Sequence, residues 1–113
     1  MRQLQHPEIK DVTVEGILYA FSDPIRVQIF MELAGSESAK SCATFANITN
    51  SPLAKSTLSQ HFRILREAGL IFSERKGVEL QNRTRCAELR ENFGEMLQAI
   101  AKAYKMQQEN HKR

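Results

Sequence analysis

The stretch STLSQHFRILREAGLIF, residues 56–72, decides the fold. Placed at about 100° per residue, its helix over 56–68 separates into two faces. The inward face is mostly apolar but includes two polar residues. It consists of Thr57, Leu58, His61, Phe62, Ile64, Leu65 and Ala68. The outward face contains no apolar residue and consists of Ser56, Ser59, Gln60, Arg63, Arg66 and Glu67. We expect Ser56 to cap the start of this helix and Gly69 to end it.

A β-hairpin is predicted directly after this helix, over residues 71–81. The segment Leu70-Ile71-Phe72 begins an apolar strand. Gly77 can adopt the positive φ that a tight hairpin turn requires. A hairpin that follows a polar-faced helix in this way is a wing, and its tip carries Arg75 and Lys76.

Two helices are expected upstream of this unit. The first is predicted by one apolar stripe at helical spacing, formed by Val14, Ile17, Leu18 and Phe21. The second, over 24–34, has Asp23 as its N-cap and Pro24 at its first helical position. Because apolar residues surround most of it, we expect it to be the buried central helix. Gly35 stands where a left-handed C-terminal cap would lie.

The remaining segments are a short helix around 42–48, a turn over 49–52 and a long helix over 87–107. The long helix carries a wide apolar stripe formed by Phe93, Met96, Leu97, Ile100, Ala101 and Tyr104. A chain of 113 residues has room for one domain. We expect its ends, residues 1–11 and 108–113, to be flexible. The predicted fold class is therefore mainly α with a small β-hairpin.

Composition restricts the function before any motif is considered. The sequence contains no apolar run long enough to span a membrane and no secretory signal at its start, so we expect a cytoplasmic protein. Two cysteines cannot form a disulfide framework. The net charge is only +3, but residues 55–85 hold seven Lys and Arg against three Asp and Glu. Positive charge gathered in one segment is typical of a surface that binds phosphate.

The outward face of the helix over 56–68 has the chemistry of a DNA-reading surface. Hydroxyls, an amide and arginines are the groups that contact base edges and phosphates. Double-stranded DNA is therefore the expected partner. The alternative is that this face is simply a solvated helix surface.

The segment LSQHFRILREAGLI, residues 58–71, resembles the recognition-helix region of the ArsR/SmtB family of bacterial repressors. The segment FSDPIRVQIFMELAG, residues 21–35, resembles the second helix of that family. The resemblance extends over residues 12–104. It implies a winged helix-turn-helix that dimerises through its first and last helices, binds an inverted-repeat operator and usually represses transcription.

The resemblance also assigns residues to roles. The DNA-binding candidates are Lys55, Ser56, Thr57, Ser59, Gln60, Arg63, Arg66, Arg75 and Lys76. The dimer-interface candidates are Val14, Ile17, Leu18, Phe93, Met96, Leu97, Ile100, Ala101 and Tyr104. His61 matches a position where the family often has histidine, but it falls on the inward face, which favours a structural role. The linking stretch 49–53 is long for a helix-turn-helix, which leaves the register of the preceding helix open.

The sequence offers no typical metal site, and we expect neither a metal nor a cofactor. Many relatives bind metal through a Cys-x-Cys pair, whereas residues 41–45 contain one thiol. The last helix offers glutamates, with His111 in the tail, and soft metals need several converging thiolates or imidazoles. Cys42 and Cys86 would form a thiol switch if the fold brought their Cα atoms within about 7 Å. An unknown small-molecule inducer, or none, is the other reading.

Two further classes of function remain to be compared with a DNA-binding repressor. A winged helix that only binds proteins would normally show aromatic or apolar anchors, which the face at 56–63 lacks. A repressor that responds to thiol oxidation would use Cys42 and Cys86. An enzyme is not expected, because the sequence contains no nucleophile elbow, P-loop, dinucleotide fingerprint or paired metal motif.

Overall fold

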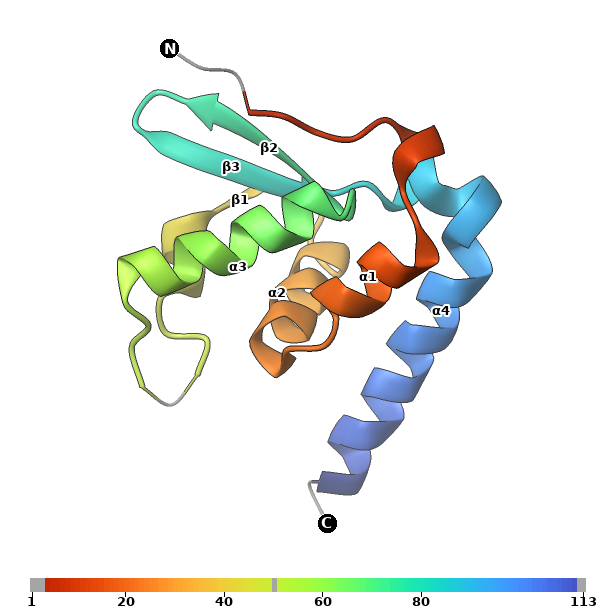
Figure 1. Ribbon diagram of the computed structural model, residues 1–113. Helices are drawn as coiled ribbons and strands as arrows, with labels where there is room; N and C mark the ends of the chain where they lie inside the picture. Colours follow the sequence, from red (N-terminus) through yellow and green to blue (C-terminus); the bar gives the residue numbers. More distant parts are fainter. Residues whose placement is uncertain (1–3, 50, 112–113) are drawn as a thin grey trace.

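The predicted helices and the hairpin follow one another in the predicted order (Figure 1). The computed structural model describes residues 4–49 and 51–111, so Asn50 of the predicted turn lies outside it. The helical elements are η1 (Ile9–Asp11), α1 (Val14–Ala20), α2 (Pro24–Ala34), η2 (Cys42–Phe45), α3 (Lys55–Glu67) and α4 (Cys86–His111). The strands are β1 (Lys40–Ser41), β2 (Ile71–Lys76) and β3 (Glu79–Thr84). None of the helices in this described part has the length and hydropathy needed to cross a membrane.

The start of α2 forms as predicted, but its end does not. The Asp23 side chain accepts a hydrogen bond from the backbone N–H of Ile25 at 2.8 Å, and Pro24 occupies the first turn. Gly35 has a φ of −84°, so the predicted left-handed cap is wrong. Its N–H instead continues the helical pattern to the carbonyl of Met31 at 3.1 Å.

Helix α3 begins one residue earlier than predicted, at Lys55. Its N-cap is Ala54, whose backbone is extended and whose methyl side chain makes no capping bond. Ser56 therefore lies inside the first turn and is not the N-cap. The predicted end is confirmed, because Gly69 has a φ of +87°. The short helix expected around 42–48 is only the single 3₁₀ turn η2.

The wing is the outer part of a three-stranded antiparallel sheet with the order β1-β3-β2. Strands β2 and β3 pair from Ile71 with Thr84 to Lys76 with Glu79, so the hairpin is longer than predicted. Gly77 has a φ of +65°, as the two-residue turn requires. Strand β1 lies in a stretch for which no helix or strand was predicted, and it pairs Lys40 with Asn82.

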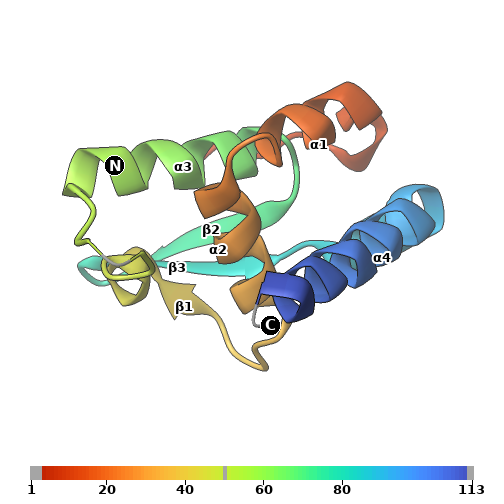
Figure 2. The same ribbon diagram turned by 90° about the horizontal axis from the view of Figure 1, so that it is seen from below.

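The core lies between α2, α3, the sheet and the first half of α4. Inward residues of α3 supply much of it, and Phe62 and Leu65 are fully buried. Phe62 meets Phe45 of η2 edge-on, with 5.6 Å between ring centroids. Figure 2 shows α3 and α4 on opposite sides of the molecule, with α2 and the sheet between them.

Both of the segments that were predicted to be flexible contain described structure, and their flexibility stays a prediction. Within residues 4–11, which were expected to be flexible, the carbonyl of Pro7 accepts a hydrogen bond from buried Arg85 at 2.8 Å. Helix α4 continues to His111 instead of ending near 107. Residues 1–3 and 112–113 lie outside the described part of the chain.

Candidate nucleic-acid interface

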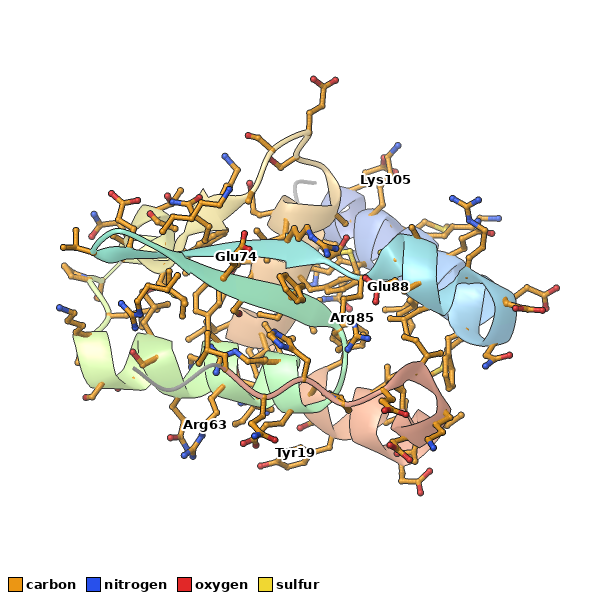
Figure 3. All side chains as sticks on the ribbon, turned by 90° about the horizontal axis from the view of Figure 1, so that it is seen from above. Tyr19, Arg63, Glu74, Arg85, Glu88 and Lys105 are labelled. Carbon is orange, nitrogen blue, oxygen red and sulfur yellow. The ribbon has the colours of Figure 1, made fainter. Side chains whose placement is uncertain are left out.

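The outward face of α3 presents polar side chains alone over its first nine residues. Buried Leu58 and Phe62 fix the rotation of the helix and turn the opposite arc to solvent. The exposed residues of this arc are Lys55, Ser56, Thr57, Ser59, Gln60 and Arg63. Arg63 donates to the side-chain carbonyl of Gln60 at 3.0 Å, and it points away from the body of the molecule (Figure 3). We name these six residues the α3 face.

The start of α3 adds positive electrostatic potential to the α3 face. Among the described residues no side chain caps the first turn, so its backbone N–H groups remain available at the positive end of the helix dipole. The exposed ammonium group of Lys55 lies in the same turn. This combination suits a phosphate group of a nucleic-acid backbone.

Arg66 does not belong to this surface, and its prediction as a DNA-binding residue is wrong. The side chain is buried, and its Nε donates to the Ser73 hydroxyl at 3.0 Å. Ser73 in turn donates to the Asn82 carbonyl oxygen at 2.7 Å. Burial is the main cause that lowers the pKa of Arg66, the charge of Arg63 adds to it, and Cys42 and Glu67 oppose it. Arg66 thus joins α3 to the two strands of the wing.

The wing tip lies at the same end of the molecule as the start of α3 (Figure 1). Arg75 and Lys76 are both exposed, but alternation along β2 places them on opposite faces of the sheet. Arg75 shares the face of buried Ser73, which contacts α3. Lys76 lies on the other face and pairs with Glu74 at 3.7 Å. Arg75 is therefore the better placed of the two cations to act together with the α3 face.

His61 points inward, as predicted, and contacts an arginine that sequence reasoning missed. Its Nδ1 lies 3.3 Å from Nη1 of Arg26, and both side chains are buried. Arg26 also donates to the carbonyl of Ala20 at 2.7 Å, the last residue of α1. Burial lowers the pKa of His61, Arg26 lowers it further, and Asp23 opposes them. The one signal in the sequence was an arginine near the start of α2, the helix expected to be buried at the centre of the fold.

The predicted dimer residues divide into two groups. Ile17 and Leu97 are buried within the subunit, so their prediction as interface residues is wrong. The others are exposed or half-buried and comprise Val14, Leu18, Phe93, Met96, Ile100, Ala101 and Tyr104. A hollow of about 530 Å³ lies between the end of α1, the start of α2 and the second half of α4. Leu18, Ile100 and Tyr104 line it.

Both cysteines are free thiols that line separate hollows. Cys42 borders a hollow of about 290 Å³ together with Leu58 of α3, and its sulfur lies 3.4 Å from the Asn82 amide nitrogen. Cys86 borders another beside Phe30. Within residues 4–49 and 51–111, no cluster of three or more His, Cys, Asp and Glu side chains could hold a metal ion.

Residues 21–72, from the end of α1 to the first strand of the wing, match a family model described as a helix-turn-helix domain. No curated protein matches the sequence significantly. The structure is similar to the homodimeric winged helix-turn-helix DNA-binding domain of a possible ArsR-family transcriptional regulator from Mycobacterium bovis. That likeness has a TM-score of 0.61 and 22% identity, and it covers 80% of each chain.

Two further solved structures have a similar fold. One is an ArsR-like transcriptional regulator from Rhodococcus sp. RHA1, with a TM-score of 0.56, 24% identity and coverage of 88% of this chain and 86% of that one. The other is the transcriptional repressor BigR from Xylella fastidiosa, with a TM-score of 0.60, 21% identity and coverage of 83% and 85%. The predicted resemblance and the winged helix-turn-helix fold are thereby confirmed.

Proposed function

From a chain that contains a helix-turn-helix domain and has the winged fold of ArsR-like regulators, we propose a homodimeric, sequence-specific DNA-binding repressor of transcription. The observation that carries this proposal is the α3 face. Its six exposed positions between residues 55 and 63 hold only hydroxyls, an amide and cations, on a helix whose other side is fixed in the core. An apolar binding partner would find no anchor on this surface.

Helix α3 enters the major groove in the proposed complex. Arg63 can donate two hydrogen bonds to a guanine, and Gln60 can pair with an adenine, once the bond between these two side chains is exchanged for contacts to bases. Lys55 and the first turn of α3 hold a phosphate, which fixes the register of the helix. Arg75 contacts the sugar–phosphate backbone beside the groove.

A dimer would double this contact along the DNA. The exposed and half-buried apolar residues of α1 and α4 supply the contact between the two subunits, with Leu18 and Tyr104 near its centre. Twofold symmetry then places the two α3 helices in successive major grooves, about 34 Å apart. The operator is accordingly an inverted repeat.

A gel-shift competition tests the proposal. The labelled probe is the DNA upstream of the protein's own gene, and the competitors are the same fragment and a random duplex of equal length. We expect the specific competitor to be at least about 1,000-fold more effective than the random one. Equal competition by the two DNAs would contradict sequence-specific binding and favour the protein-interaction module.

A variant pair links the result to the α3 face. Replacing Ser59 and Gln60 together by Ala removes base-reading groups without changing the charge, so we expect specificity to fall while binding to random DNA persists. Ser38 is exposed in the loop between α2 and β1, and Ser38→Ala is the control that should leave both affinities unchanged. Retained specificity in the Ser59 and Gln60 variant would show that another surface reads the bases.

A further inference from the structure

The segment that precedes α1 runs along the wing. In Figure 1 it passes beside β2 on its way to η1. The backbone N–H of Ser73 donates to Nε2 of His6 at 2.9 Å. The His6 ring also stacks on Phe72, with 4.4 Å between centroids and 17° between planes. Two consecutive residues of β2 are thus held by one side chain.

This contact supplies a hydrogen-bond acceptor to a backbone N–H group at the open edge of the sheet. Strand β2 is the outer strand of the order β1-β3-β2, so the N–H groups on its far side have no strand to bond. The N–H of Ser73 is one of them, and His6 supplies the missing acceptor. An imidazole nitrogen can accept this bond only while it carries no proton.

The same segment is clamped at the joint between α3 and the wing. Arg85, which is buried, donates to the carbonyl of Pro7 at 2.8 Å. A Cβ on Gly69, in the turn between α3 and β2, would lie 2.5 Å from a methyl group of Val12 and 3.4 Å from the Pro7 ring. Pro7 and Val12 therefore pack directly against the turn that joins α3 to the β2–β3 hairpin and so sets the angle between them.

We propose that residues 4–12 form a strap that fixes the wing relative to α3 for DNA binding, and that neutral His6 is the positioning residue of this strap. The DNA-binding part rests on the proposed function. The holding of β2 by His6 does not, because it concerns the free protein.

The surroundings of His6 lower its pKa and so oppose its protonation. Burial is the largest cause that lowers the pKa of His6 below its ordinary value of 6.5, followed by Arg66 of α3 and Arg85, whereas the Leu4 carbonyl and Glu88 of α4 raise it. Arg83 of β3 lies against the same Phe72 ring, at 4.6 Å from its centroid. Glu88 is also shared with Arg83 and Arg85, at 3.5 and 3.1 Å. On the strap itself, Glu8 and Lys10 pair with each other at 3.5 Å.

The sign of the pH dependence follows from this lowered pKa. A histidine whose folded-state pKa is depressed stabilises the folded form fully above the unfolded value, and the effect is lost as the pH falls through the folded value. The strap is therefore closed at neutral pH and opens in acid.

Hydrogen exchange at the Ser73 amide, measured by NMR, tests the strap directly. At about pH 8 we expect His6→Ala to lower the protection factor of this amide at least about tenfold, while the other amides of the β2–β3 ladder keep theirs. Between about pH 8 and about pH 5, the wild-type protection should fall by a similar factor. In His6→Gln, which keeps an acceptor but cannot titrate, protection should stay closer to wild type and lose its pH dependence.

His111→Gln is the matched control, since His111 is exposed at the end of α4 and should behave as wild type. His61 titrates in every one of these proteins, so the difference between wild type and His6→Gln isolates His6. Unchanged Ser73 protection in His6→Ala would overturn the strap.

The second arm measures binding to a fluorescent random 30-base-pair duplex at low salt. We expect His6→Ala to weaken binding by about three- to tenfold, and His111→Gln to have no effect. Full affinity in His6→Ala, together with lost Ser73 protection, would overturn the role of the strap in DNA binding. If the wild type itself failed to bind any duplex, the proposed function would fail, and hydrogen exchange would still decide whether His6 holds β2.

Discussion

Arg63 and Arg66 lie three residues apart in the same helix and have opposite surroundings. Arg63 is exposed on the α3 face, whereas Arg66 is buried against Ser73. On the helix, Arg66 is only about 40° from Phe62, so its long side chain can follow the core edge to the sheet. Only Arg63 is free to contact DNA.

Arg63→Ala should therefore weaken binding to the specific operator by about 1–3 kcal/mol and relax the preference at the base pair it contacts. Fluorescence anisotropy against the operator and a set of single-base variants measures both effects. Arg63→Lys keeps the charge without the bidentate geometry and should lose discrimination with a smaller loss of affinity. Intact discrimination in Arg63→Ala would contradict the placement of α3 in the groove.

Gly69 and Gly77 form a matched pair for testing the contact between strap and turn. Both have positive φ, at +87° and +65°, but a Cβ would clash with Val12 only at Gly69, and it would meet nothing within 4 Å at Gly77. Each Gly→Ala change should cost about 1–2 kcal/mol of unfolding free energy through the backbone. Gly69→Ala should cost about 1–3 kcal/mol more through overpacking. Urea denaturation measures the difference, and equal costs would show that Val12 moves aside freely.

At the scale of elements, periodicity decides which features the sequence could predict. Helices α1, α2, α3 and α4 and the hairpin were predicted because each contains enough residues to show a helical or alternating pattern. Strand β1 has two residues and η2 has four, which is too few for a period. Their positions depend on tertiary contacts such as the pairing of Lys40 with Asn82.

The site was predicted less completely than the fold, for a related reason. A helical wheel separated the rest of the α3 face from the core and placed His61 inward, but it turned Thr57 inward, and Thr57 is exposed. It misassigned Arg66, since a wheel shows the direction of a Cα–Cβ bond and not where a long side chain ends. Strap contacts such as His6 with Ser73 join residues 67 positions apart, and no local pattern indicates them.

We expect the two cations of the wing to contribute unequally to DNA affinity. Lys76 is paired with Glu74, whereas Arg75 shares the sheet face of Ser73, which contacts α3. We expect each of the variants Arg75→Ala and Lys76→Ala to weaken binding by a similar factor for every DNA sequence. The factor should be larger for Arg75→Ala than for Lys76→Ala. For Arg75→Ala the slope of log K against log salt should become shallower by about 1. A titration series over salt concentration measures it, and an unchanged slope would exclude a phosphate contact by Arg75.

At the scale of the whole molecule, α4 extends beyond the core that holds its first half. It contains 26 residues, and its buried ones are Leu89 and Leu97. Ile100, Ala103 and Tyr104 border the open hollow beside α1 and α2, and Leu18 there is 55% exposed. One subunit alone leaves this surface in water, which favours the proposed dimer.

Leu18→Glu should therefore convert the proposed dimer to a monomer without unfolding the subunit. A carboxylate buried at the interface should raise the dissociation constant at least about 100-fold, by about 3 kcal/mol. Val78→Glu is the control, because Val78 is 95% exposed at the wing tip, far from the hollow. Sedimentation equilibrium gives the dissociation constants, and circular dichroism checks the fold. A dimer that persists in Leu18→Glu would place the contact elsewhere.

Arg26 connects the helix proposed for the dimer contact, α1, with the helix proposed for DNA binding, α3. Its side chain holds the last carbonyl of α1 and the ring of His61 in α3 at the same time. Any free energy that this arginine transmits between the two helices acts equally in both directions. If dimerisation through α1 raises the affinity for an operator by some factor, operator binding must raise the affinity between the subunits by that same factor. Replacing Arg26 would then uncouple two equilibria while leaving the residues that touch DNA intact.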